Sequence, residues 1–192
     1  MHAIRTTPGF IIDSRPYGEA GKTLSVFTRD FGLVMATAQG IRLERSKLRY
    51  HAQEYSFGIF SLVKGKEFWR LTSASEVFSG IDTDSLAMTA RIALLLRRLL
   101  RGEEAHPELF DCVESCAVFL ANSPGLTDEQ MKTLESIVVL RIMDMLGYIG
   151  DDKSIDDGLK SSVFSVGLLD GSAGKRAIMN RHINKALRES HL

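Results

Sequence analysis

Residues 9–50 decide the fold of this chain: GFIIDSRPYGEAGKTLSVFTRDFGLVMATAQGIRLERSKLRY. The stretch holds three short apolar runs rich in Ile, Val, Leu, Phe and Thr, at residues 9–14, 23–28 and 32–38. Turn signals separate the runs, RPYG (residues 15–18) with Gly21 behind it and RDFG (residues 29–32). Runs interrupted this often favour strands, because a helix needs a longer uninterrupted period. The stretch therefore predicts an antiparallel meander.

Two further apolar runs follow a basic loop. After Gly40, which lets the chain turn, the loop carries four cations, Arg42, Arg45, Lys47 and Arg49. The fourth run lies within residues 51–63, and the fifth lies at residues 68–78 after the turn KGKE (residues 64–67). Five strands with one longer excursion after the third are typical of a five-stranded OB-fold β-barrel.

The periodicity becomes helical from Asp84. An apolar face recurs at Leu86, Ala90, Ala93, Leu94, Leu96, Leu99 and Leu100 and ends near Gly102. A second helix begins near Pro107 and ends before the break at residues 122–125, and a third begins at the capping box TDEQ (residues 127–130) and ends at Gly147. A polar, acidic connection (residues 151–158) and Gly171-Ser-Ala-Gly174 precede a basic last helix at residues 175–189. We therefore predict an α+β protein with an OB-fold domain at residues 1–80 and an α-helical domain at residues 81–192.

Composition excludes several classes of protein. None of the apolar runs in the 192 residues approaches the roughly 20 needed to span a membrane. The N-terminus MHAIRTTPGF has no apolar core of a secretory signal, and two cysteines do not make a disulfide framework. We expect a cytoplasmic protein without a membrane partner.

The zero net charge conceals an asymmetry. Residues 1–80 carry 11 Lys/Arg against 7 Asp/Glu, whereas residues 81–170 carry 8 against 16, and residues 171–192 carry 5 against 1. A basic N-terminal half with four cations in one loop favours a polyanionic partner, although a net charge of +4 on 80 residues is also within ordinary surface variation.

No catalytic constellation stands out. GEAGKT (residues 18–23) resembles a phosphate-binding loop, but Pro16 stands where the first glycine is required, and a strand follows instead of a helix. Cys112 and Cys116 lie one helical turn apart without further ligands at zinc-site spacing, so we interpret them as buried core residues. The five histidines are scattered. We predict no enzyme, no metal and no cofactor.

The order of several motifs resembles the RecO family of recombination mediators. These are RPYGE (residues 15–19), LSVFTRDFG (residues 24–32), AQGIR with the following Ser46-Lys47, LTSASE (residues 71–76), and LRIMDMLGY (residues 140–148) at the end of a central helix. The resemblance implies non-sequence-specific binding of single- and double-stranded DNA, strand annealing and help in loading the RecA recombinase. It also implies contact with RecR through the barrel and with the acidic tail of the single-stranded-DNA-binding protein through the helical domain.

The chain departs from the family at two places. The family's four-cysteine zinc element is absent from residues 151–170, and Gln39 and Leu43 stand where the family usually has basic residues. Arg42, Ser46 and Lys47 match the basic loop, and Arg45 and Arg49 partly replace the missing charges.

A set of basic and aromatic side chains forms the predicted DNA-binding site. Cations would neutralise phosphates, and aromatic rings would stack on bases. Its members are Arg15, Lys22, Arg29, Arg42, Arg45, Lys47, Arg49, Tyr17 and Trp69. Tyr50 and Phe68 are further candidate rings, and alternation requires that either Phe68 or Trp69 points outward. Two alternatives stay open: a protein-interaction module whose barrel docks a partner, and an RNA-binding OB-fold protein.

Overall fold

The structure is a computed structural model that describes residues 3–76, 83–150, 159 and 163–189. The chain divides into two compact units. One comprises Met1–Gly80 with Thr89–Phe110, and the other comprises Ile81–Met88 with Asp111–Leu192. The domain boundary at residue 80 stays a prediction.

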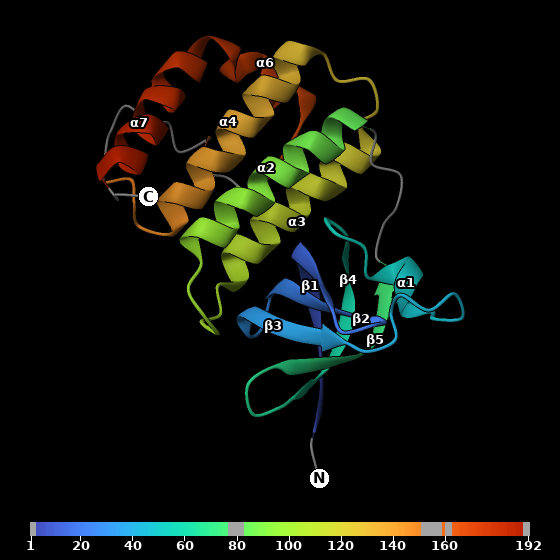
Figure 1. Cartoon of the computed structure of the whole chain (residues 1–192). Coiled ribbons are helices and arrows are strands. Elements are labelled where there is room, and N and C mark those ends of the chain that lie inside the picture. Colours follow the sequence, from blue (N-terminus) through green and yellow to red (C-terminus); the bar gives the residue numbers. More distant parts are fainter. Residues whose placement is uncertain (1–2, 77–82, 151–158, 160–162, 190–192) are drawn as a thin grey trace. The chain divides into compact units, whose positions relative to one another are not determined.

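Five strands form a closed barrel in the order β1-β2-β3-β5-β4 (Figure 1). They are β1 (Ile4–Tyr17), β2 (Gly21–Thr28), β3 (Gly32–Ala38), β4 (Phe57–Lys64) and β5 (Trp69–Glu76). The long β1 pairs with β4 through its first half and with β2 through its second half, and the register shifts between Ile11 and Asp13. A bulge of this kind bends a strand, which lets β1 serve both neighbours. A parallel pairing of β3 with β5 completes the barrel, and the predicted OB-fold is confirmed.

The alternation of side chains sets the interior of the barrel. Buried residues on it include Leu24 and Val26 of β2, Val34 and Ala36 of β3, and Trp69 of β5. In β3 the intervening Met35 is exposed and Thr37 is half-buried, whereas in β2 the intervening Ser25 is also buried. Two predicted boundaries differ from the structure. β1 continues through the predicted turn to Tyr17, and a short helix α1 (Leu48–His51) precedes β4, which begins at Phe57 rather than near residue 51.

Part of the predicted helical half belongs to the barrel unit. It comprises the later part of α2 (Thr83–Leu99), a connection, and the first turn of α3 (Pro107–Asn122). The ring of Phe110 lies 5.5 Å from Phe27 and 6.4 Å from Phe57, which in turn stacks on Phe10 at 4.2 Å. These aromatic contacts bind the segment to the outer surface of the barrel.

The apolar face predicted for α2 is partly wrong. Leu86 and Leu94 are 43% and 53% exposed, whereas Met88 and Ile92 are buried. The spacing of apolar residues alone does not separate these positions, because α2 is apolar around most of its circumference near residues 92–96.

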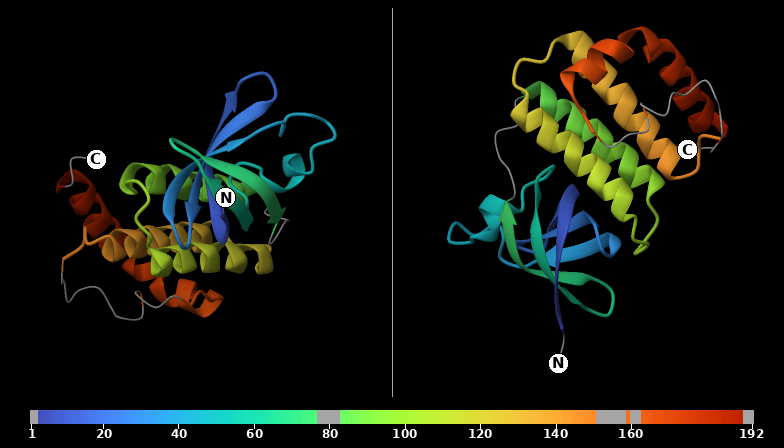
Figure 2. Two further views of the ribbon diagram at one scale, coloured as in Figure 1. Left: turned by 90° about the horizontal axis from the view of Figure 1, so that it is seen from below. Right: turned by 180° about the vertical axis from the view of Figure 1, so that it is seen from behind.

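The second unit contains α4 (Asp128–Met145), α6 (Val166–Ser172), the 3-10 turn η1 (Ala173–Lys175) and α7 (Arg176–Glu189). The predicted capping box is present, with Thr127 and Gln130 exchanging side-chain and backbone hydrogen bonds. Met179, Ile183 and Ala186 form the buried face of α7, and Ser136 of α4 bonds Asn180 at 3.0 Å. Figure 2 shows α4 and α7 from two further sides. Helix α6 was not predicted, and the predicted acidic connection at residues 151–158 lies outside the described residues.

None of the helices in the described parts of the chain is long and apolar enough to cross a membrane.

Candidate nucleic-acid interface

The basic loop between β3 and α1 is anchored to the barrel by buried side chains and backbone hydrogen bonds. Ile41 is 2% exposed and belongs to the barrel core, as does Ala52 just after α1. Gly40 has φ +66°, and its carbonyl accepts a 3.1 Å hydrogen bond from the amide of Leu43. The amide of Arg42 donates a 3.0 Å hydrogen bond to the carbonyl of Ala20, in the β1–β2 turn. The left view of Figure 2 shows this turn and the loop side by side.

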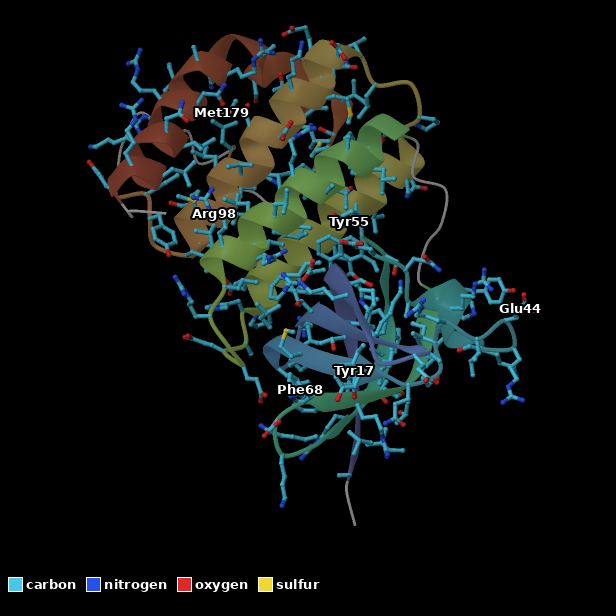
Figure 3. The ribbon with its side chains drawn as sticks, in the orientation of Figure 1. Tyr17, Glu44, Tyr55, Phe68, Arg98 and Met179 are labelled. Carbon is cyan, nitrogen blue, oxygen red and sulfur yellow. The ribbon has the colours of Figure 1, made fainter. Side chains whose placement is uncertain are left out.

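The four loop cations are exposed, and the described part of the chain offers them no ion-pair partner. Arg42, Arg45, Lys47 and Arg49 each lie at the surface, and none of them makes an ion pair with another described residue. The loop also carries Glu44, whose side chain lies at the loop's outer end in Figure 3. Unpaired cations are available to phosphates without breaking an internal ion pair, so the loop suits a polyanion.

The other predicted DNA-binding cations differ in whether a carboxylate lies close to them. Arg15 Nε lies 3.0 Å from a carboxylate oxygen of Asp13, whose other oxygen lies 3.2 Å from Arg97 of α2. Arg29 lies 3.9 Å from Asp30. Lys22 is half-buried, and no described carboxylate lies within ion-pair distance of it. Arg15 and Arg29 are therefore partly neutralised, whereas Lys22 is not.

The structure separates the candidate aromatic rings. Tyr17, Tyr50 and Phe68 are 54%, 65% and 42% exposed. Trp69, in contrast, is 4% exposed, and its ring lies 5.3 Å from that of Phe31. A buried ring offers no face to a base, so the stacking role predicted for Trp69 does not fit its place in the core.

Two carboxylates that the sequence did not indicate bind candidate site residues. Glu103 accepts a 2.8 Å hydrogen bond from the indole of Trp69 and a 2.7 Å hydrogen bond from Lys64. Asp13 joins Arg15 to Arg97. Neither carboxylate stands in a motif, and only the folded chain brings each to its partners.

The cysteines lie in the helical unit and are buried. Burial raises the pKa of both Cys112 and Cys116. Among the described residues, no group of three His, Cys, Asp or Glu side chains could hold a metal ion. The position of the family's zinc element lies largely outside the described residues.

Known proteins match this chain over the barrel and beyond it. Residues 1–79 match the family model described as Recombination protein O N terminal. A DNA repair protein RecO of Desulfitobacterium hafniense is 35% identical over 145 residues, covering 72% of this chain and 50% of the relative. A DNA repair protein RecO of Alkaliphilus metalliredigens is 29% identical over 148 residues (75% and 57%), and one of Salmonella newport is 27% identical over 157 residues (77% and 63%). The matches thus span about half to three fifths of these relatives. The chain belongs to the RecO family.

Proposed function

We propose that this chain is a recombination mediator in DNA repair, a binding protein rather than an enzyme. It binds single- and double-stranded DNA without sequence specificity, anneals complementary strands and, with RecR, helps to load the RecA recombinase. The observation that carries the proposal is the basic loop: four exposed cations, without an ion pair to any residue that the structure describes, on a segment anchored by Ile41 in the core of an OB-fold.

The chemistry of the loop matches the annealing function. Annealing requires a surface that screens two polyanions while leaving the base edges free to pair. Lys and Arg contacts to phosphates do this, and the counterions they release make binding steeply dependent on salt. Hydrogen bonds within the loop and to the β1–β2 turn hold the backbone that carries these cations.

The partners are proposed from the family. RecR would contact the barrel, and the acidic tail of the single-stranded-DNA-binding protein would contact the helical domain. The exposed face of α7 supports the second contact, because Arg181, Lys185 and Arg188 line one depression there. Glu189 also lines it and lies 3.9 Å from Lys185, which leaves two of the three cations without that carboxylate. An acidic peptide is the complementary ligand for such a face.

Fluorescence anisotropy with labelled single-stranded DNA at low and moderate salt tests the DNA-binding proposal. The intact chain is compared with a variant in which Arg42, Arg45, Lys47 and Arg49 are replaced by Ala. Because four phosphate contacts on a single strand contribute a slope of about −0.7 each, we expect the variant to bind weakly and with a shallower salt dependence. If the intact chain fails to bind even at low salt, the mediator proposal is wrong.

One observation favours the alternative, a protein-interaction module. Leu43, in the middle of the basic loop, is 42% exposed and stands where the family usually has a basic residue. An exposed leucine flanked by Arg42 and Glu44 suits a protein surface better than a phosphate backbone. Under this alternative the quadruple variant loses binding to RecR, and neither protein binds DNA.

A further inference from the structure

The β4–β5 turn holds Phe68 outside the barrel in a defined position. The amide of Gly65 donates a 3.1 Å hydrogen bond to the carbonyl of Phe68, and a Cβ at Gly65 would lie 2.3 Å from that oxygen. The next residue, Trp69, is fixed inside by its hydrogen bond to Glu103. Phe68 is the last residue of the turn before β5, and 42% of its surface is exposed (Figure 3). The ring is thus both accessible and constrained by the turn.

Two exposed cations lie close to this ring in the sequence. Lys66 and Arg70 are exposed, and neither makes an ion pair with any residue in the described part of the chain. Lys64 is different, because Glu103 neutralises it at 2.7 Å. Lys66 stands two residues before the exposed ring and Arg70 two residues after it, with the exposed carboxylate of Glu67 directly before the ring. Two cations against one carboxylate leave this segment with a net positive charge, which suits a ligand that has a flat apolar face beside phosphates.

The strand register extends this surface across the barrel. Arg70 of β5 pairs with Thr37 of β3, Thr37 pairs with Thr23 of β2, and Thr23 pairs with Arg15 of β1. These four residues form one row across adjacent strands, with small hydroxyl side chains between two arginines. Three strand spacings separate Arg70 from Arg15, or about 14 Å. Beyond Arg15, the exposed ring of Tyr17 ends the strand.

This row of four residues crosses the face of the barrel on which OB-folds bind oligonucleotides. OB-folds bind oligonucleotides across the face of their second and third strands, between the β1–β2 and β4–β5 loops. In this barrel Tyr17 adjoins the first of these loops and Phe68 lies in the second, so one ring stands at each end of a basic, polar row.

We propose that Phe68 stacks on an unpaired base and makes the chain distinguish single strands from duplex. This inference rests on the proposed DNA binding and adds to it a residue outside the basic loop. Arg70 and Lys66 hold the phosphates beside the stacked base. In a duplex the base faces are covered by their neighbours, so the ring contributes nothing, whereas the loop cations bind either form.

The test compares Phe68→Ala with the intact chain by fluorescence anisotropy. The probes are a labelled oligo(dT) of about 20 nucleotides, longer than the site of one OB-fold, and a duplex of the same length. Oligo(U) of the same length is the third probe, because stacking alone does not separate DNA from RNA. Ile59→Ala is the matched control, since Ile59 is also an exposed apolar residue (37%) of the barrel and pairs with Pro8 and Ser75 away from the row. Thermal unfolding verifies that the variants are folded.

We expect Phe68→Ala to weaken oligo(dT) binding by about 5- to 100-fold and to leave duplex binding and the salt slope unchanged. Phe68→Tyr restores oligo(dT) binding, and Ile59→Ala has no effect. An equal loss for oligo(dT) and duplex overturns the stacking role. Unchanged oligo(dT) binding also overturns it. An intact chain that binds none of the probes overturns the proposed function itself, a result distinct from either failure of Phe68.

Discussion

Trp69 Nε1 donates a 2.8 Å hydrogen bond to Oε1 of Glu103, 34 residues later in the chain. The other oxygen of Glu103 accepts a 2.7 Å hydrogen bond from Lys64, whose Nζ lies 5.4 Å from the centre of the Trp69 ring. Glu103 thus fastens the ends of β4 and β5 to the connection after α2. The hydrogen bonds from Lys64 and then Trp69 lower the pKa of Glu103, because both favour its charged form.

Trp69 is the chain's only tryptophan, so its fluorescence reports this contact directly. The folded-state pKa of Glu103 is lowered, so the contact persists at the pH where a free glutamate is half protonated and weakens as pH falls through the lowered pKa. We expect the emission of Trp69 to shift to the red in that acidic range before global unfolding. In Glu103→Gln the amide oxygen still accepts from the indole and does not titrate in this range, and this early shift disappears. Identical titrations of the two proteins would contradict the contact.

Arg141 is buried in the helical unit, and replacing it tests how its burial is stabilised. Its Nε donates a 2.6 Å hydrogen bond to the carbonyl of Leu159, and its guanidinium lies 4.3 Å from the centre of the Phe164 ring. Burial lowers its pKa, and the neighbouring Cys112 and Cys116 oppose that shift in part. We expect Arg141→Ala to cost about 2–5 kcal/mol of unfolding free energy, because it leaves a cavity.

Arg141→Met separates volume from charge. Methionine fills most of the space without a desolvated cation, so we expect a loss below ~1 kcal/mol or a gain in stability. Urea unfolding of the full chain measures both variants. A methionine variant as unstable as the alanine variant would show that the charge itself stabilises the fold.

Cys112 and Cys116 should be inert in the folded protein. Both are buried, and burial raises the pKa of each thiol above its ordinary value, so little thiolate exists near neutral pH. We expect neither cysteine to react with a thiol-specific reagent at pH 8 under native conditions and both to react in denaturant. Rapid native labelling of either one would contradict the buried positions.

Gly32, the first residue of β3, should not tolerate a side chain. Its φ is +68°, and a Cβ there would lie 2.2 Å from the carbonyl oxygen of Glu104. Both the backbone conformation and the clash with another backbone segment oppose a side chain, so Gly32→Ala should lower stability by more than ~2 kcal/mol. Gly18 has a similar φ of +61° with open space around it, so Gly18→Ala is the matched control and should cost less. Chemical unfolding checks both.

The ion pairs predict an order among the candidate DNA contacts. Arg15 is held by Asp13, whereas Arg42 makes no ion pair with a described residue. A phosphate must compete with Asp13 for Arg15, so Arg42→Ala should weaken single-stranded DNA binding more than Arg15→Ala does. Asp13→Asn releases Arg15 and should strengthen binding at low salt. Anisotropy titrations at matched salt measure the order, and a weaker Asp13→Asn variant would contradict it.

Much of the barrel was predictable because its signals are local. The run at residues 32–38 becomes β3 with the predicted bounds, since Gly32 takes a left-handed turn conformation and buried Val34, Ala36 and Ala38 then alternate with more exposed residues. The capping box at Thr127 was equally local, because its two hydrogen bonds join residues three apart. Helix α6 escaped prediction because its seven residues include Gly167 and Gly171, which weaken any helical pattern.

The candidate site was predictable only in part. The cations of the basic loop were identified from their density in the sequence. The choice between Phe68 and Trp69 was not, because strand alternation requires one inward ring but does not say which. Glu103 decides it by bonding the indole, and nothing near residues 68–69 in the sequence indicates a carboxylate at residue 103.

The sequence by itself determined the OB-fold barrel, the following helices and the basic loop, because strand alternation, helix caps, turn glycines and charge density are properties of neighbouring residues. The order of its motifs also carried the resemblance to the RecO family. The tertiary structure alone decided which cations are free and which ring is exposed. Asp13 forms ion pairs with both Arg15 and Arg97, and Arg97 lies 84 residues from Asp13 in the chain. Glu103 forms an ion pair with Lys64 and accepts a hydrogen bond from Trp69. Ion pairs and hydrogen bonds depend on distances in space of about 3 Å, and only folding brings such distant residues that close.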